Sequence, residues 1–549
     1  MWTRPGGSPG GDRREPDACA IVRAVPGTDV RGDIFPREGP ERGATAVVQW
    51  EQALAAVRAR HYRGADVLGV TEDTHRLIPG MVFVARPGRH ADGHAFLTEA
   101  RERGALLTVG ERAVAADLPD VVVPDAAAAL SHLVSAWWGD PGAGMVLVGV
   151  TGTNGKTTVA HLLAQILRAA GYRAGQVGTL GFRFEDDFSA THHTTPPPEV
   201  LYPLLCRWRD AGCTHVVMEV SAQALSQRRV AALRFAAAAL TGFSRDHGEY
   251  YQDLQEYRRA KEELFSALTS GSAVLPRDDP QYAAFAAAAA GCRILTFGPG
   301  GEVQGEPAGT AELGGGRIRL QLPDERERVL HFPLPGMHNL RNALCAAATA
   351  LSLGVQARAI FEGLSAAGSV PGRAMVLRAP GGMTAVVDYA HNPAALKEIL
   401  RTVRAGTPGR LYAVLGPRGE RDRGKRPLMG AILAAFADAA VITSDRPGSE
   451  LPEEAAAPML QAARDCGLRA EFVADRGEAI AMTAARLRRG DCLLVTGKGL
   501  EPWGAGDSAV LPASDAEILR RCVPNLVSLH EAASGPDRPI ALAIPLSRA

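Results

Sequence analysis

A glycine-containing loop with one lysine and several threonines is the first place in the chain where phosphate chemistry could occur. Its sequence, Thr-Gly-Thr-Asn-Gly-Lys-Thr-Thr, covers residues 151–158 and lies between an apolar run and an amphipathic segment. Small residues let backbone N–H groups approach phosphate oxygens, and the start of a helix adds partial positive charge. A strand–helix turn without a ligand is the alternative. We expect a nucleotide site formed by Gly152, Thr153, Asn154, Gly155, Lys156, Thr157 and Thr158.

Two residues further along the chain, Glu219 and His247, could complete a catalytic metal site. Glu219 follows an apolar run, His247 follows Ser-Arg-Asp, and Lys261 lies in a helical pattern over 254–268. Phosphoryl transfer needs Mg²⁺, and Mg²⁺ prefers hard oxygen ligands such as carboxylates. Taken alone, each residue has a structural interpretation: a capping carboxylate, a packed histidine and a solvated surface lysine.

The elements that must position these groups are predicted by hydrophobic patterning. Apolar runs at 145–150, 214–219 and 236–243 are typical of buried parallel strands, and 159–170 has a helical pattern. Polar residues follow these strands, and ligands of open α/β sheets bind at the carboxyl ends of the strands. Similar runs at 383–388, 410–415, 440–443 and 491–496 predict a second doubly wound sheet.

We therefore expect an α/β protein with three domains and two tails. Residues 1–44 are rich in Gly, Pro and charged residues and predict a disordered tail. A small α/β domain is expected over 45–144, a central domain with a P-loop and a parallel sheet over 145–373, a Rossmann-like domain over 374–523, and a second tail over 524–549.

Composition excludes several classes of function. The chain has 549 residues, of which 46% are hydrophobic and 22% charged, and Lys+Arg and Asp+Glu number 60 each. This balance predicts neither nucleic-acid binding nor attraction to an acidic membrane. The eight cysteines show no CxxC spacing, and the N-terminus lacks the apolar run of a signal peptide. These observations favour a soluble cytoplasmic protein, and we expect a monomer.

Several motifs together resemble the Mur ligase family from about residue 69 to about residue 521. Residues 69–76, Gly-Val-Thr-Glu-Asp-Thr-His-Arg, resemble the family's GVTxDSR segment, and the loop at 151–158 matches TGTNGKTT. Residues 244–247 match SRDH, 370–373 resemble the VPGRM junction, 388–393 match DYAHxP, and 416–427 resemble GxGGDRDxGKRP. The chain looks most like the branch of the family that adds the third residue of the peptidoglycan stem peptide.

The resemblance implies a reaction and a set of roles. ATP would phosphorylate a carboxylate of a UDP-N-acetylmuramoyl-peptide, and the amine of an amino acid would then displace phosphate. Lys156, Glu219, His247 and Lys261 would be catalytic, and Thr157, Glu219, His247 and a carbamylated Lys261 would organise Mg²⁺. Beyond the loop, ATP would be held by Asn339, Arg373 and Asp388. The uridine-linked substrate would be held by Thr74, Thr194, Thr195, Ser221, Gln227 and Arg229, and the acceptor amino acid by Asp445, Arg446, Gly497 and Glu501.

The acceptor segment departs from the family pattern. Enzymes that add diaminopimelate carry a DNPR motif, whose arginine can grip a carboxylate with two hydrogen bonds. Here residues 445–448 are Asp-Arg-Pro-Gly, and Leu500 replaces the histidine of GKGHE. Ala222 and Gln223 also stand where Ser-His is usual. The sequence leaves open which amino acid is added, and whether the chain is a related ligase with another carboxylate substrate or a nucleotide-binding protein without catalysis.

Overall fold

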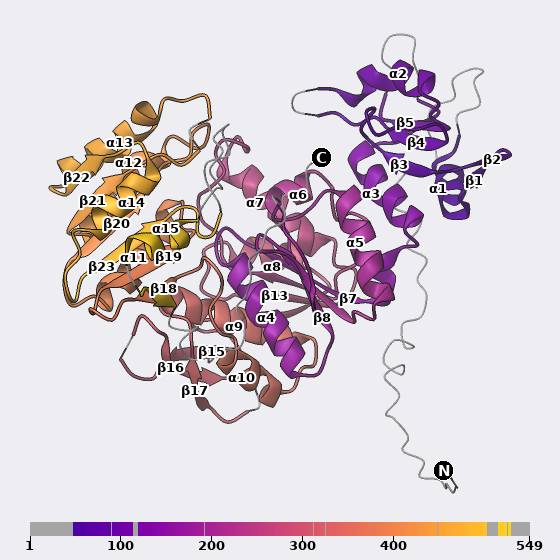
Figure 1. Ribbon diagram of the computed structural model, residues 1–549. Coiled ribbons are helices and arrows are strands. Elements are labelled where there is room, and N and C mark those ends of the chain that lie inside the picture. The colour runs from indigo at the N-terminus through magenta and orange to yellow at the C-terminus, as the bar shows by residue number, and fades with distance from the viewer. Residues whose placement is uncertain are drawn as a thin grey trace, which may run out of the picture.

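The protein is built from three α/β units that stand side by side, with the first and third on opposite sides of the second (Figure 1). The computed structural model describes residues 48–88, 91–112, 119–191, 193–310, 312–323, 325–446, 448–501, 514–523 and 525–528. The expected tail over 1–44 lies outside these residues, as does most of the one over 524–549. No helix of the described ranges is both long and apolar enough to cross a bilayer.

The first unit is a four-stranded parallel sheet in the order β3-β4-β5-β6. Strand β4 is buried on both sides: Val82 and Val84 pack on the core that contains α3, whereas Phe83 packs on the core that contains α2. A small hairpin, β1-β2, precedes the sheet. The elements are α1 Trp50–Ala59, β1 His61–Tyr62, β2 Ala65–Asp66, β3 Gly69–Thr71, β4 Met81–Val84, η2 Gly93–Phe96, α2 Leu97–Glu102, β5 Leu107–Gly110, β6 Val121–Val122 and α3 Ala126–Trp137.

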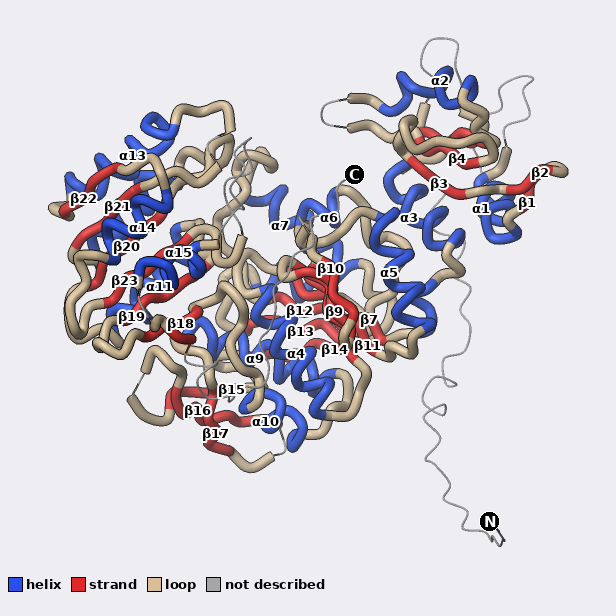
Figure 2. The backbone as a smooth tube through the Cα atoms, in the orientation of Figure 1, coloured by secondary structure: helices blue, strands red, loops and turns tan. Residues whose placement is uncertain are grey.

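The second unit is an eight-stranded sheet in the order β10-β9-β8-β11-β7-β12-β13-β14, with helices on both faces (Figure 2). Strands β8, β11, β7, β12, β13 and β14 are parallel to one another. At one edge of the sheet β9 pairs antiparallel with β8, and β10 pairs antiparallel with β9. The first elements are η3 Pro141–Gly144, β7 Val146–Thr151, α4 Lys156–Ala169, β8 Ala174–Gly178, β9 Gly181–Phe184, β10 Asp187–Ser189, α5 Pro198–Asp210 and β11 His215–Glu219. The unit continues with α6 Ala222–Ser226, β12 Ala237–Leu240, α7 Leu254–Ser266, β13 Ser272–Pro276, α8 Tyr282–Ala288 and β14 Arg293–Phe297.

Alternation along the central strands divides the core of this unit in two. Val148 and Val150 of β7 face α4 and α9, whereas Leu147 faces the side covered by α5, α7 and α8. Such double burial explains why these strands are continuous apolar runs. In register, Glu219 of β11 is level with Val150, and Leu240 of β12 is level with Thr151. The carboxyl ends of three neighbouring strands therefore meet at one place.

A three-stranded antiparallel sheet and two helices complete the second unit. The sheet order is β15-β16-β17, and β16 alternates between buried and partly exposed residues because only one face is covered. This sheet was not anticipated from the sequence. The elements are β15 Gln304–Pro307, β16 Gly316–Gln321, β17 Arg328–Phe332, α9 Met337–Ser352 and α10 Ala357–Ser365.

The third unit is a seven-stranded sheet in the order β22-β21-β20-β23-β19-β18-β24. Its strands are parallel except β18 and β24, which run antiparallel at one edge. Strand β24 corrects the expected boundary of the C-terminal tail, because Val527 and Ser528 pair with Arg378 and Leu377. The elements are β18 Met375–Arg378, β19 Thr384–Asp388, α11 Pro393–Ala405, β20 Leu411–Leu415, α12 Lys425–Phe436, β21 Ala439–Ile442, α13 Pro452–Asp465, β22 Arg469–Phe472, α14 Arg476–Ala484, β23 Cys492–Thr496, α15 Asp515–Cys522 and β24 Val527–Ser528.

Candidate active site

The loop between β7 and α4 is packed so closely that two of its glycines have no room for a side chain. A Cβ on Gly152 would collide with the Thr241 hydroxyl at the end of β12, and Gly152 has φ of 140°. A Cβ on Gly155 would collide with the Asn342 amide oxygen, and Gly155 has φ of 87°. Both backbone conformations favour glycine. The loop therefore presents its main chain at the start of α4, as a phosphate cradle requires.

Two amines, one from half-buried Lys156 and one from fully buried Lys261, converge on the Gly152 carbonyl oxygen. Lys156 Nζ donates to it at 2.9 Å and Lys261 Nζ at 3.0 Å, and Lys156 also donates to the Thr153 carbonyl at 3.2 Å. Burial lowers the pKa of Lys156 below its usual value. Burial, and then the charge of Lys156, lower the pKa of Lys261 well below its usual value. Two amines this close favour an anion between them and a neutral form of at least one.

The Glu219 carboxylate lies beside the loop and is fully buried. It accepts hydrogen bonds from the Thr157 hydroxyl at 2.9 Å, from the Thr179 backbone N–H at 2.8 Å and from the Thr179 hydroxyl at 3.2 Å. Arg373, at the junction to the third unit, donates from Nη2 to Thr157 Oγ1 at 3.0 Å. A buried carboxylate that faces only hydroxyl and amide donors is suited to a cation.

The residues present fit a magnesium ion that is shared with a phosphate ligand. No group of three or more His, Cys, Asp or Glu side chains in the described part of the chain could hold a metal by itself. Mg²⁺ commonly takes one or two carboxylates and completes its shell with phosphate oxygens and water. Glu219 and Thr157 supply such a pair. His247 has φ of 58°, and its ring lies beside Glu249, at 3.4 Å, and beside Tyr257.

The residues expected to hold the uridine-linked substrate form a chain of hydrogen bonds next to Glu219. Thr195 Oγ1 donates to the Glu219 carbonyl at 2.8 Å and accepts from the Ser221 backbone N–H at 3.0 Å. Arg229 donates to the Thr195 carbonyl and to the Gln227 side chain. The Thr194 hydroxyl contacts the Thr179 hydroxyl at 3.2 Å, and the Thr179 hydroxyl in turn donates to Glu219, whereas Thr74 is buried in the first unit.

Two residues expected at the ATP site make structural hydrogen bonds. Asp388 accepts from the backbone N–H groups of Ala374 and Ala390, both at 2.7 Å, and so fixes the turn that carries Arg373. Asn339 donates to the Pro335 carbonyl at 2.8 Å at the start of α9. Both side chains are buried. Asp388 lies next to Arg373, and Asn339 lies on α9, the helix that packs on the loop. Both side chains therefore support the loop region.

The four residues expected at the acceptor site gather around Arg418, which sequence reasoning missed. Arg418 donates from Nε to Asp445 at 3.3 Å and from Nη2 to Glu501 at 2.9 Å and to the Gly497 carbonyl at 3.3 Å. Arg446 lies 3.6 Å from the same Glu501 carboxylate. The Tyr389 hydroxyl donates to Glu501 at 2.6 Å. The Tyr389 ring contacts the guanidinium groups of both Arg373, at 4.1 Å, and Arg418, at 5.4 Å.

Polar contacts join the second and third units across the site. Asn392, the N-cap of α11, donates to Asn154 Oδ1 at 2.9 Å and to Asp246 Oδ2 at 3.0 Å. Lys425 Nζ lies 3.7 Å from Asp246 Oδ1. The loop containing Asp246 and the start of α11 are thereby held against the phosphate loop, which brings the acceptor side of the third unit toward the nucleotide side of the second.

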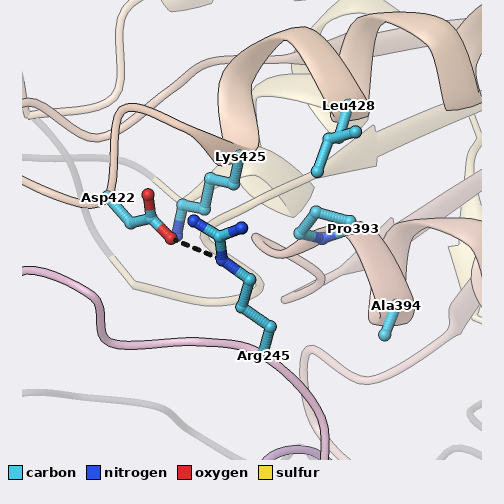
Figure 3. Close-up of a pocket in the computed structure, with 6 residues that line it drawn as sticks. All are labelled: Arg245, Pro393, Ala394, Asp422, Lys425 and Leu428. Atoms are coloured by element: carbon cyan, nitrogen blue, oxygen red, sulfur yellow. Dashed lines mark ion pairs between the residues drawn. The ribbon is translucent and has the colours of Figure 1, made fainter. Parts of the chain in front are cut away.

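A cavity of about 120 Å³ lies at this joint, lined by Arg245, Pro393, Ala394, Asp422, Lys425 and Leu428 (Figure 3). Arg245 of the second unit extends into it and pairs with Asp422 of the third unit at 3.5 Å. Lys425, at the start of α12, points toward the same carboxylate. The cavity is too small for a nucleotide, and its charged lining belongs to the joint between the units.

Comparison with known proteins agrees with this architecture. The family model for the Mur ligase middle domain matches residues 150–350, and that for the Mur ligase glutamate ligase domain matches residues 372–499. A UDP-N-acetylmuramoyl-L-alanyl-D-glutamate--2,6-diaminopimelate ligase of Gloeobacter violaceus is 37% identical over 477 residues, covering 86% of this chain and 96% of the relative. The enzyme of the same name from Alkalilimnicola ehrlichii is 39% identical over 468 residues, covering 82% and 93%.

Solved structures resemble this chain over most of their length. A structure described as UDP-N-acetylmuramoyl-L-alanyl-D-glutamate--2,6-diaminopimelate ligase has a TM-score of 0.60 at 28% identity and covers 83% of this chain and 94% of its own. A UDP-N-acetylmuramoylalanyl-D-glutamyl-2,6-diaminopimelate--D-alanyl-D-alanyl ligase from Acinetobacter baumannii has a TM-score of 0.57 at 21% identity, covering 83% and 96%. The second likeness shows the fold alone.

Proposed function

The chain belongs to the Mur ligase family, and from this premise we propose that it is an ATP-dependent ligase that forms an amide bond. Its proposed substrates are the free carboxylate of a UDP-N-acetylmuramoyl-dipeptide and the amine of an amino acid, in the assembly of peptidoglycan. The observation that carries the proposal is the convergence of Lys156, Lys261 and the Thr157–Glu219 pair at the carboxyl ends of adjacent strands.

In the first step a substrate carboxylate oxygen attacks the γ-phosphorus of ATP, and ADP leaves. Lys156 could stabilise the transferred phosphoryl group, because its amine is hydrogen-bonded to the loop that would hold the phosphates. Glu219 and Thr157 would hold Mg²⁺, which neutralises charge on the phosphates when it is bound. Arg373 lies beside Thr157 and can bind phosphate oxygens with two parallel hydrogen bonds.

In the second step the amine of the acceptor attacks the acyl phosphate carbon, and inorganic phosphate leaves while the amine loses a proton. Asp445, Arg446, Gly497 and Glu501 would position the acceptor. The uridine-linked substrate would approach from the side of Thr74, Thr194, Thr195, Ser221, Gln227 and Arg229. Contacts between the second and third units, such as those of Asn392 with Asn154 and Asp246, would bring the two reactants together and would help to exclude water from the acyl phosphate.

We further propose that Lys261 is carbamylated in the working enzyme. Its neutral amine would form a bond with CO₂ and release a proton, which turns the side chain into a carboxylate-like group. A lowered pKa increases the neutral fraction that this reaction requires. The product would place a negative charge beside Lys156 and the metal site, in place of a second positive charge.

The proposed function is tested by phosphate release from ATP in the presence of UDP-N-acetylmuramoyl-dipeptide, Mg²⁺ and an amino acid. We expect release to require all four components and to yield an amide product by mass spectrometry. Lys156→Ala should lower the rate at least ~100-fold, in line with the loss of a group that stabilises charge in the transition state. Exposed Lys397→Ala is the matched control and should keep the rate.

Three outcomes would contradict the proposal or the role given to the loop. If the protein binds ATP and Mg²⁺ but releases no phosphate with any combination of the substrates, it is a nucleotide-binding protein without this activity. If phosphate is released only with a different carboxylic acid, it is a ligase of another pathway. Near-normal ligation by Lys156→Ala would remove the assigned role of the loop.

A further inference from the structure

Two neighbouring loops of the third unit bring Arg418 into the acceptor site. Arg418 follows β20 and Asp445 follows β21, and the two residues form an isolated parallel bridge. The Gly419 N–H donates to the Arg446 carbonyl at 3.2 Å, which fixes the two loops side by side. The side chains of the two loops therefore share one small volume.

Position 448 carries no side chain in this protein, and an arginine stands on the neighbouring loop instead. In the motif GxGGDRDxGKRP a glycine stands at position 418, whereas in DNPR an arginine stands at position 448. Here Gly448 has φ of 63°, and a Cβ on it would lie 2.6 Å from the Glu420 carboxyl carbon. The guanidinium of Arg418 instead reaches Asp445 and Glu501 from the first loop.

Several contacts fix the guanidinium group of Arg418 in place. Its side chain is 17% exposed, so it is largely enclosed but still reaches the surface of the site. The Tyr389 ring lies against one part of it, and the Gly497 carbonyl accepts one of its hydrogen bonds. A guanidinium fixed by several partners loses little further freedom when it binds a carboxylate.

The charges around the site favour an anionic ligand over a cationic one. Asp445 is fully buried and has two cationic partners, Arg418 and Lys498, the latter at 3.2 Å. Glu501 lies beside Arg418 and Arg446. Three cations therefore face two carboxylates, and an additional ammonium group would find both carboxylates engaged. An additional carboxylate would find a net positive surface.

Resting on the proposed function, we propose that Arg418 is a specificity-determining residue that selects an acceptor amino acid whose side chain ends in a carboxylate. Arg418 takes the place of the arginine that position 448 lacks. An acceptor whose side chain ends in an ammonium group without a carboxylate is disfavoured by the same charges.

A matched pair of acceptors tests the inference, because 2,6-diaminopimelate and lysine differ only by one carboxylate. The ratio of kcat/KM for diaminopimelate over lysine is measured for the wild type and for Arg418→Gln, Arg418→Lys and Arg410→Gln. We expect the wild type to favour diaminopimelate. Arg418→Gln should lower the ratio at least tenfold, and Arg418→Lys should lie between, since lysine keeps the charge but not the paired donors. Arg410, exposed at the opposite ends of the strands, is the control and should leave the ratio unchanged.

The ratio distinguishes selection from support of the fold. A purely structural Arg418 would lower kcat/KM for both acceptors equally and leave the ratio intact, which would overturn the inference. A wild type that favours lysine would also overturn it. If Arg418→Gln does not fold, Arg418→Lys and the double change Arg418→Lys with Arg446→Gln must still lower the ratio. Failure of the wild type to release phosphate with either acceptor would count against the proposed function, whereas ligation with an unchanged ratio counts against Arg418 alone.

Discussion

Replacing Glu219 by glutamine separates a role in metal binding from a role in the fold. In Glu219→Gln the amide oxygen can keep the hydrogen bond from the Thr179 N–H, while the amide nitrogen faces the hydroxyl oxygens of Thr157 and Thr179, which can turn to accept. Bonds to a charged acceptor, each worth ~1.5–3 kcal/mol, become neutral ones worth ~1 kcal/mol, and the cost of burying a charge disappears. We expect a net loss of about 1–2 kcal/mol in the free energy of unfolding.

The effect on catalysis should be larger. Without the Glu219 charge the site loses its buried carboxylate for Mg²⁺, and we expect phosphate release to fall ~100- to 1000-fold, equivalent to about 2.7–4 kcal/mol. The remaining activity should need a higher Mg²⁺ concentration. The assay combines phosphate release over a range of Mg²⁺ with urea unfolding of the same samples. Glu453→Gln, at an exposed position of α13, is the control.

A structural role would give the opposite pattern. If Glu219 only caps Thr157 and Thr179, the folded variant turns over at the wild-type rate and its Mg²⁺ dependence is unchanged, while its unfolding midpoint falls. That result would refute the assignment of Glu219 to the metal site.

Three further changes probe the site and its supports. Lys261→Ala should lose phosphate release and recover part of it with short-chain carboxylic acids, measured by the same assay; full activity without added acid would remove the carbamate. Asn392→Ala breaks bonds to both Asn154 and Asp246 and removes the N-cap of α11, so it should raise KM for ATP several-fold and also lower the free energy of unfolding by ~1 kcal/mol, measured by kinetics and urea unfolding. The Arg426 hydrogen bond lowers the pKa of Glu450 to about 2, so this pair stabilises the fold above the unfolded pKa near 4.3 and is lost as pH falls toward 2. Glu450→Gln should therefore flatten the loss of urea stability between about pH 5 and pH 2; an unchanged slope would contradict this.

Much of the central architecture could be predicted because it depends on local patterns. Buried parallel strands are continuous apolar runs, and the runs before Thr151, after Thr214 and before Thr241 are strands at or near the expected ends. The three-stranded sheet β15-β17 was missed because its strands mix polar residues with apolar ones and so form no continuous apolar run. Strand β24 has two residues, and its existence depends on pairing with β18, far away in sequence.

The candidate site, too, could be predicted only in part from the sequence. Contacts around the phosphate loop follow from motifs with fixed spacing, and the structure gathers Lys156, Thr157 and Glu219 as expected. Arg418 contacts residues 27 and 83 positions away, and no local pattern marks such contacts. A signal did exist, since Arg418 stands where the motif GxGGDRDxGKRP has a glycine. Its meaning required knowledge of which loops lie side by side.

The Tyr389 ring links the residues around the phosphate loop with the residues around the acceptor site. The guanidinium group of Arg373, which donates to Thr157, and that of Arg418, which donates to Asp445, both lie against the ring, while the Tyr389 hydroxyl donates to Glu501. A substitution of Tyr389 that changes the acceptor site would also shift Arg373, which donates to Thr157. The specificity for the acceptor amino acid is therefore best changed by substitutions in the loops around Arg418 and Asp445, with Tyr389 kept.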